Sequence, residues 1–244
     1  MEDNDGLWTA MFGAAQCFRY AVTKNESVAE IATRNFRGLR LLNHVTSIDG
    51  LLARTVSLNK GGADWLKFNA SSGAPCEDCD ELYWKSGISQ DSIIGHLFFL
   101  PIYAELVVEN VEEQKEVIEL FLGIVNRMVE NDYQMVDFDG KRTKWGFWDP
   151  ANLNAKLEYG ENRGLNSLQI LTFLAAAESL SIKYGIPLKH QYIADHFLKL
   201  YTQHGYGKNV LNVKMDWPCN NNFSDDEQAV LWGFFNFNYY RKKL

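Results

Sequence analysis

The chain has 244 residues, 46% hydrophobic and 23% charged, an ordinary globular composition with room for one large domain. Its formal net charge is -7, and basic residues cluster only at Arg241, Lys242 and Lys243, which argues against a nucleic-acid partner bound through phosphate contacts. We count no apolar run as long as a membrane span, and the first six residues do not resemble a signal peptide. The sequence as written predicts a soluble, cytoplasmic protein with no membrane partner; a missing N-terminal leader would make it a secreted one.

The first two predicted helices form a helical hairpin. Residues 6–23 are mostly apolar, and they follow Asp3, Asn4 and Asp5, side chains that suit the positive N-terminal end of a helix. Residues 26–45 carry apolar side chains at helical spacing and charges on the opposite face. This pattern predicts an apolar inner helix followed by an amphipathic outer helix.

A connecting stretch separates the first hairpin from the second. Residues 51–58 predict a short strand that carries Arg54, and residues 59–80 predict a loop, because Gly, Ser and Asp are frequent there without any periodicity. This loop contains Cys76 and Cys79, whose spacing resembles half of a zinc site. Because a structural zinc ion takes four ligands and no second pair of this kind exists, a local disulfide or free thiols are favoured over a metal.

The second predicted hairpin begins with the most apolar helix of the chain. Residues 89–108 have few polar side chains on any face, and either Ser89 or Asp91 can cap the helix. A helix that is apolar nearly all round is buried in a larger assembly. Its partner over residues 111–130 is amphipathic, with a face rich in Glu and Lys.

The rest of the chain repeats this scheme. In order, we expect two short extended runs over 133–144 around a turn at 137–140, an aromatic loop at 145–150, an apolar helix that begins after 163–166, an amphipathic helix at 188–204, a loop at 205–222, and a last helix at 228–240 opened by 224–227. Apolar helices inside and amphipathic helices outside describe two concentric layers. We therefore expect one all-α domain over residues 1–244, with the polar starts of the inner helices on one side.

Five short segments carry a resemblance to a known family: Asp3–Trp8, Asp91–His96, Trp145–Trp148, Arg163–Leu168 and Ser224–Glu227. They resemble segments of the six-hairpin glycosidase-like proteins, in hairpin order and cap motifs over most of the chain. The resemblance implies an (α/α) helical-hairpin toroid or partial toroid, with short β segments in the loops. It also implies a carbohydrate ligand in a cleft at the ends of the inner helices. We count three hairpins and one further helix where six hairpins close a ring, so the ring is expected to be truncated, open or completed by a partner.

Glycoside hydrolysis needs two carboxyl groups that flank the scissile bond, one of them protonated. Asp91 is the first choice for a catalytic residue, because Trp84, His96 and further aromatic residues stand near it in the sequence, and Asp5 or Asp226 is its expected partner. A carboxylate at the start of a helix is a better base or hydroxyl acceptor than a proton donor, since the helix dipole favours its charged form. The simplest structural interpretation of each aspartate is a helix cap.

The candidate substrate-binding residues are aromatic, cationic or amide side chains near the expected cleft: Trp8, Arg54, Trp84, His96, Trp145, Trp148, Arg163, Asn166 and Trp217. Tryptophan rings pack on the apolar faces of sugars, and a few placed polar groups hold the hydroxyls. Each tryptophan can instead pack between helices and loops. Arg54 and Arg163 can bind a carboxylated sugar or tie loops to acidic caps, and His96 can simply be a buried, hydrogen-bonded side chain.

The sequence therefore predicts a carbohydrate-active protein, with glycoside hydrolysis as the leading activity. A non-catalytic module for sugar binding or protein interaction is the alternative, favoured by the incomplete ring. A polysaccharide lyase or a sugar epimerase is less favoured. We expect no cofactor and no metal, because the chain has no P-loop, dinucleotide-binding glycine motif or zinc-protease motif. Self-association is expected from the exposed edge of an unclosed helical array.

Overall fold

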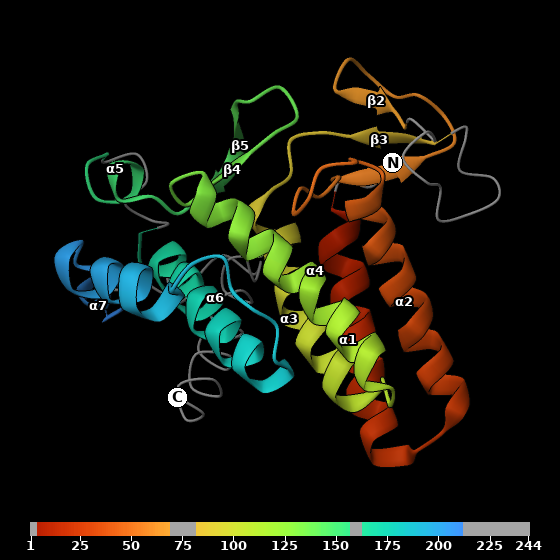
Figure 1. Ribbon diagram of the computed structural model, residues 1–244. Coiled ribbons are helices and arrows are strands. Elements are labelled where there is room, and N and C mark those ends of the chain that lie inside the picture. Colours follow the sequence, from red (N-terminus) through yellow and green to blue (C-terminus); the bar gives the residue numbers. More distant parts are fainter. Residues whose placement is uncertain (1–3, 69–81, 157–162, 212–244) are drawn as a thin grey trace, which may run out of the picture. The chain divides into compact units, whose positions relative to one another are not determined.

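The computed structural model describes residues 4–68, 82–156 and 163–211 (Figure 1). Across these residues the chain is mostly helical, and it carries a three-stranded and a two-stranded antiparallel sheet. The prediction of a helical protein with short β segments is confirmed at this level. Closure of the helices into a toroid stays a hypothesis.

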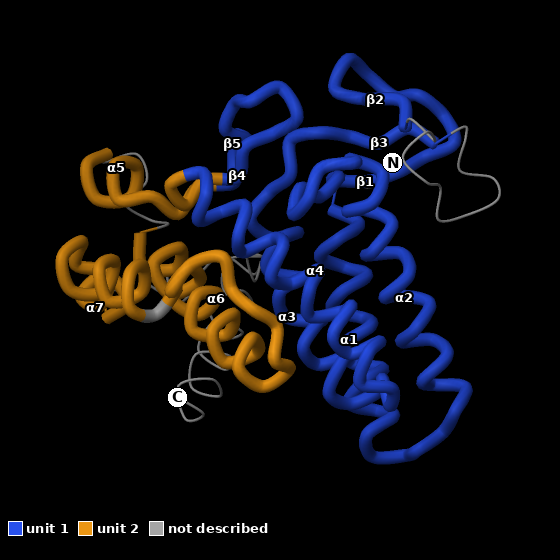
Figure 2. Tube along the Cα trace, viewed as in Figure 1, with its two compact units in different colours: residues 1–131, 135–146 blue, residues 132–134, 147–244 orange. Residues whose placement is uncertain are grey.

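The chain divides into two compact units (Figure 2). Unit 1 comprises Met1–Asn131 and Met135–Gly146, and unit 2 comprises Asp132–Gln134 and Phe147–Leu244. Each unit is described by itself below. The prediction of a single domain over the whole chain stays a prediction.

Unit 1 contains the first two predicted hairpins. Its helices are α1 (Asp5–Thr23), α2 (Glu26–His44), α3 (Gln90–Leu106) and α4 (Val111–Glu130). The outer helices α2 and α4 start at asparagine caps, Asn25 and Asn110, whose side chains accept hydrogen bonds from backbone N–H groups of the first turn. The hairpin boundaries were predictable because the caps and the apolar periodicity are both local signals.

The first turns of the inner helices confirm Ser89, one of the two caps predicted for the apolar helix, and contradict the interpretation of Asp5 and Asp91 as caps. Asn4 is the N-cap of α1 and Ser89 the N-cap of α3, and neither side chain makes a capping hydrogen bond. Asp5 and Asp91 lie one and two positions further on, inside the first turn. Both carboxylates are therefore outside the cap position that the simplest interpretation gave them.

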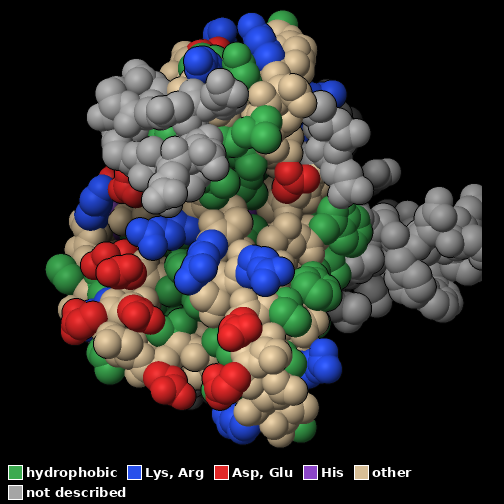
Figure 3. All heavy atoms as spheres, turned by 90° about the vertical axis from the view of Figure 1, so that its right-hand side faces the viewer, with side chains coloured by type: hydrophobic (Ala, Val, Ile, Leu, Met, Phe, Trp, Pro, Cys, Tyr) green, Lys and Arg blue, Asp and Glu red, His purple; other side chains and the backbone are tan. Residues whose placement is uncertain are grey.

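The outer helix α2 has a charged outward surface. Its buried side chains, Val28, Ala32, Leu39 and Leu42, lie on one face, as predicted for an amphipathic helix. Figure 3 looks at the side of the molecule where α2 lies in Figure 1 and shows Lys and Arg side chains beside Asp and Glu side chains. Charges of both signs therefore share this face.

The strands differ from the prediction in extent and number. They are β1 (Thr55–Ser57), β2 (Trp65–Lys67), β3 (Tyr83–Lys85), β4 (Gln134–Val136) and β5 (Arg142–Phe147). β3 pairs with β1 on one side and with β2 on the other, so β2 lies inside a stretch expected to be a loop. The predicted hairpin around residues 137–140 is confirmed as β4 and β5, but β5 extends through Trp145 into the expected aromatic loop.

Unit 2 contains the third apolar helix and several shorter helices. These are α5 (Pro150–Leu153), α6 (Arg163–Tyr184), η4 (Tyr192–Phe197), η5 (Lys199–Gln203) and α7 (Tyr206–Leu211). The amphipathic α-helix expected over 188–204 is instead two π-helical segments, and α7 occupies part of the loop expected at 205–222. The helix predicted over 228–240 lies outside the described residues.

Helix α6 contradicts the prediction that no apolar run is as long as a membrane span. Among the described residues it is the one helix long and apolar enough to cross a membrane, and 83% of its most apolar window is buried inside the protein. Ser167, Gln169 and Thr172 interrupt the apolar run in the sequence, and the structure buries all three. Burial of this extent is what the core helix of a folded unit shows.

Small residues let α1 and α3 approach closely in unit 1. A Cβ atom at Gly95 of α3 would lie 2.9 Å from the Leu7 Cα and 3.1 Å from the Ala10 Cβ of α1. A Cβ atom at Gly6 would lie 2.8 Å from the His96 ring, and one at Gly13 would lie 2.7 Å from the Phe99 ring. These contacts advance together along both helices, so α1 and α3 run parallel and begin at the same end. The prediction that polar helix starts share one side is confirmed for this pair.

Replacement of Gly95 by alanine should separate these helices. We expect Gly95→Ala to lower the free energy of unfolding by about 1–3 kcal/mol, because the new methyl group meets the backbone of α1 rather than a flexible side chain. Gly38→Ala on α2 is the matched control, since a Cβ atom there meets nothing within 4 Å. The control should change stability by between zero and a gain of about 1 kcal/mol from helix propensity. Urea denaturation of both variants measures the difference, and equal effects would contradict the packing argument.

Candidate functional site at the N-terminal ends of α1 and α3

Arg54 ties together three segments at the starts of the inner helices. Its Nη2 donates to the Asn4 Oδ1 over 2.9 Å, and its Nη1 donates to the Gly87 carbonyl over 3.1 Å. Ser89 Oγ donates to the same Asn4 oxygen over 3.4 Å. The start of α1, the residue before β1 and the loop before α3 are thus joined. Arg54 was expected either to bind a carboxylated sugar or to tie loops to the acidic helix starts, and these bonds agree with the second role.

Two carboxylates of unit 1 accept hydrogen bonds from the same segments. Thr55 Oγ1 donates to Asp5 Oδ2, and Thr55 itself is buried. Asp137 Oδ2, in the β4–β5 turn, accepts the backbone N–H of Gly87 over 2.8 Å. Gly87 has a φ of 76°, a left-handed conformation that glycine adopts without strain. The loop before α3 is therefore held by a carboxylate on one side and by a guanidinium on the other.

Asp91 differs from these carboxylates. It lies in the first turn of α3 and is half-buried. Within the described residues its carboxylate has no hydrogen-bond or ion-pair partner. Of Asp5 and Asp91, the two predicted catalytic residues that the structure describes, Asp91 is thus the one whose carboxylate has no described partner. Asp226, the third predicted catalytic residue, lies outside the described residues.

His96 is fully buried between α1, α2 and α3. Its Nδ1 lies 2.8 Å from the Ser92 carbonyl oxygen, and its Nε2 lies 3.4 Å from the Leu39 carbonyl oxygen. A neutral ring with its proton on Nδ1 donates to Ser92. Burial lowers the pKa of His96 below 6.5, although both carbonyl contacts oppose that shift. These contacts are those of the buried, hydrogen-bonded histidine that the sequence left open as an alternative.

The predicted tryptophans separate into exposed and buried rings. Trp8 on α1 is 46% exposed, and Trp145 on β5 is 48% exposed with the Lys144 Nζ 4.3 Å from its ring centroid. Trp84 on β3 is buried and packs edge-on against Phe138. Trp148 is fully buried, and Trp217 lies outside the described residues. Only the two exposed rings offer a face to a ligand among the described tryptophans.

Three predicted residues belong to unit 2 and hold α6 to the chain before it. Trp148 Nε1 donates to Gln169 Oε1 over 2.7 Å, and Arg163 Nε donates to the Leu153 carbonyl over 2.6 Å. Asn166 Nδ2 donates to the Phe147 carbonyl over 3.0 Å. Each is thus a packing contact within unit 2. Their predicted contact with a sugar stays a prediction.

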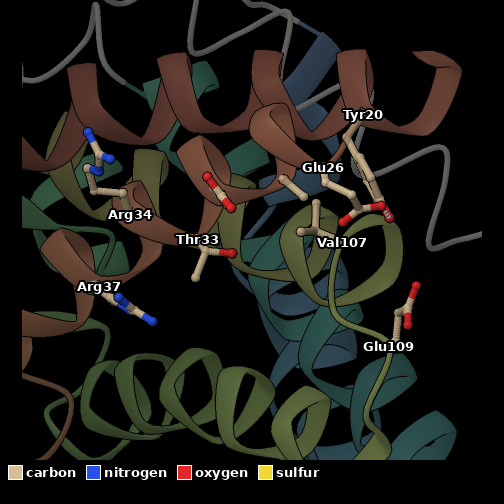
Figure 4. Close-up of a pocket in the computed structure, with 9 residues that line it drawn as sticks. Tyr20, Glu26, Thr33, Arg34, Arg37, Val107 and Glu109 are labelled. Atoms are coloured by element: carbon tan, nitrogen blue, oxygen red, sulfur yellow. Dashed lines mark hydrogen bonds between the residues drawn. The ribbon is translucent and has the colours of Figure 1, made fainter. Parts of the chain in front are cut away.

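A polar groove lies at the other end of the helices in unit 1. It has a volume of about 740 Å³ and is lined by Tyr20, Glu26, Ala29, Glu30, Thr33, Arg34, Arg37, Val107 and Glu109. Figure 4 shows Arg34 and Arg37 at one end of it and Tyr20, Glu26 and Glu109 at the other. Tyr20 is fifteen residues along α1 from Asp5, roughly 20 Å at the rise of an α-helix. The groove therefore does not coincide with the N-terminal ends of α1 and α3, where Asp5 and Asp91 lie.

The sequence analysis missed part of this cluster. Asn4, Thr55 and Gly87 were not predicted as site residues, whereas Asp137 was one of the carboxylates expected near the cleft. Their contacts join positions about fifty or more residues apart, so no local pattern could have paired them.

Of the four cysteines, Cys17 lies within the described residues. Cys17 is buried in α1, and burial raises the pKa of its thiol to about 12. No group of three or more His, Cys, Asp or Glu side chains that could hold a metal occurs in the described ranges. Cys76, Cys79 and Cys219 lie outside them.

Comparisons of this chain with protein-family models, curated proteins and solved structures give no match. The resemblance to the six-hairpin glycosidase-like proteins therefore rests on the sequence segments alone.

Replacement of Arg54 should loosen the helix starts. We expect Arg54→Met to lower the free energy of unfolding by about 1–3 kcal/mol, because Asn4 and the Gly87 carbonyl lose a charged donor. Arg40→Met on α2 is the control, since Arg40 is exposed and has no hydrogen-bond or ion-pair partner within the described residues. The control should change stability by less than about 0.5 kcal/mol. Urea denaturation compares the two, and an Arg54→Met variant as stable as the control would refute the tie.

The neutral, buried state of His96 should make stability depend on pH. The unfolded chain takes up this proton near pH 6.5, whereas the folded chain takes it up only at a lower pH. The stabilisation is therefore complete above pH 6.5 and is lost as the pH falls. His96→Asn, which keeps a donor near the Ser92 carbonyl, should flatten this part of the pH dependence in urea denaturation. His204→Asn is the control and should keep the wild-type slope.

His196 in unit 2 is expected to supply a residual pH dependence, because burial and His190 lower its pKa as well. An identical slope in the wild type and in His96→Asn would contradict the role assigned to His96.

Proposed function

We propose that this chain is a carbohydrate-active protein whose ligand-contact face is formed by the N-terminal ends of α1 and α3. The supporting observation is that the parallel contact of these helices brings Asp5 and Asp91, far apart in the sequence, to the same end of unit 1. Carboxylates beside backbone N–H groups suit the hydroxyls of a sugar. The exposed ring of Trp145 is the platform proposed for its apolar face.

Glycoside hydrolysis is the activity that we propose for this face. Asp91 acts as the base that accepts a proton from the attacking water, since its carboxylate is not engaged elsewhere in the described residues. Asp5 already accepts the Thr55 hydroxyl, so it is better suited to hold a sugar hydroxyl than to donate a proton. Asp226 is then the proposed acid that protonates the leaving oxygen.

The architecture that we propose is a partial (α/α) toroid. The sequence pairs an apolar helix with an amphipathic one in each hairpin, and α1 and α3 are adjacent and parallel as inner helices of such a ring are. A partial ring leaves the starts of its inner helices accessible from one side. This access is what a polymeric or branched carbohydrate needs.

A non-catalytic sugar-binding module of the same architecture is the second proposal. It is favoured by the bonds among Asn4, Arg54 and Ser89, which use several polar groups of the helix starts for structure. In such a module Asp91 and Trp145 bind a sugar without reaction. The two proposals differ in whether product is formed.

A panel of neutral and uronic oligosaccharides separates these proposals. Binding is followed by tryptophan fluorescence, and hydrolysis by chromatography of the products. Turnover would support the hydrolase, and a fluorescence change without product would support the binding module. A chain that neither binds nor cleaves any member of the panel would overturn both.

Asp91 is the residue whose removal should separate binding from turnover. We expect Asp91→Asn to lower the turnover number by at least about a hundredfold while the affinity for oligosaccharide changes little, because the amide cannot accept a proton. Asp139→Asn, the same substitution in the exposed β4–β5 turn, is the control and should keep full activity. An Asp91→Asn variant with undiminished turnover would exclude the assigned role.

A further inference from the structure

Helix α1 carries an apolar stripe on the side that faces away from its partners. Its buried residues, which include Gly6, Ala10, Gly13 and Cys17, lie on the opposite side. The stripe consists of Trp8, Phe12, Ala15, Phe18, Arg19 and Val22, all of them exposed. Phe12 is 53%, Phe18 44% and Val22 86% exposed, and Arg19 is the one charged member. An apolar helix face of this length points to an interface.

The order of residues along the stripe is symmetric. Ala15, the smallest member, is at its centre, Phe12 and Phe18 lie three positions to either side, and Trp8 and Val22 lie seven positions to either side. A two-fold axis through Ala15 therefore places the two alanines against each other and the large apolar residues of one copy against those of the other. Such a surface is complementary to a second copy of itself when the two helices run antiparallel.

We propose that α1 forms a two-fold symmetric, antiparallel contact with α1 of a second copy of this chain, centred on Ala15. Ala15 lets the two backbones approach, and the phenylalanines fill the space on both sides of the axis. Arg19 then lies beside the aromatic ring of Phe12 of the second copy, on which a guanidinium can stack. The antiparallel helix dipoles add a small favourable contribution.

The size of the stripe sets the strength of this dimer. Its half-exposed aromatic rings and Val22 together present roughly 400 Å² per copy. Two copies then bury roughly 800 Å², which is below the roughly 1,000 Å² of stable specific interfaces and fits a weak, transient contact. The dimer is therefore expected to dissociate in the micromolar range rather than to be obligate.

This inference is independent of the proposed carbohydrate activity. It does assign Trp8 to the dimer contact, which leaves Trp145 as the exposed sugar platform of unit 1. Loss of the dimer and loss of sugar binding are measured separately, so either proposal can fail without the other.

Sedimentation equilibrium over a micromolar concentration series tests the dimer. We expect Phe12→Glu to weaken dimerisation by on the order of a hundredfold, because the two-fold axis places the buried carboxylate in the interface twice. Phe138→Glu is the matched control, a phenylalanine 47% exposed in the β4–β5 turn of the same unit, and should keep the wild-type dissociation constant. Circular dichroism should show that both variants keep the helical content of the wild type.

Ala15→Cys supplies a second measurement that does not depend on weakening the contact. Mild oxidation should join two chains through the substituted positions, since a two-fold axis brings their Cβ atoms together. The wild-type chain with its four native cysteines is the control, and mass spectrometry of the peptides identifies the linkage. A monomer at every concentration, or a dimer unaffected by Phe12→Glu, would overturn the proposal. A disulfide from Ala15→Cys to a native cysteine of the same chain would also overturn it, because another segment of the chain would then cover the stripe.

Discussion

The close approach of α1 and α3 is the constraint on which the rest of unit 1 depends. Glycines at positions 6, 13 and 95 leave no room for a methyl group between the helices. Because the small residues of α1 are used on this side, its large apolar residues are left on the other side, where Phe12 and Phe18 are exposed. The same packing therefore places Asp5 and Asp91 at one end of unit 1 and leaves the apolar stripe exposed.

The polar ends of these helices show how such a contact is completed. The N-caps of α1 and α3 make no capping bond themselves, and Arg54 instead links Asn4 to the loop before α3. A charged donor shared by two acceptors is strong where water is partly excluded. Asp91 is left without a partner in the described residues, and this asymmetry makes the cluster a candidate for ligand binding rather than only a structural tie.

The sequence predicted the helices of unit 1 well, but it did not predict which distant segments are in contact. The apolar periodicity and asparagine caps of α2 and α4 are local, and their boundaries followed. Strand β2 was missed because β3, with which it pairs, lies some eighteen residues later along the chain. Trp84 and Trp148 were grouped with the exposed tryptophans, since position beside a turn does not reveal whether a ring is covered. The sugar-binding roles stay predictions for this reason.

By itself the sequence determined that this protein is mostly helical, that its helices alternate between apolar and amphipathic, and that acidic residues stand at the helix starts. These properties depend on periodicity and on side chains within one turn of each other. Only the tertiary structure decided that Arg54 bonds to Asn4, that His96 is buried against the Leu39 carbonyl, and that Trp145 rather than Trp148 is exposed. Each of these depends on which distant segments pack together, and packing free energy belongs to the assembled contacts rather than to any local run of residues.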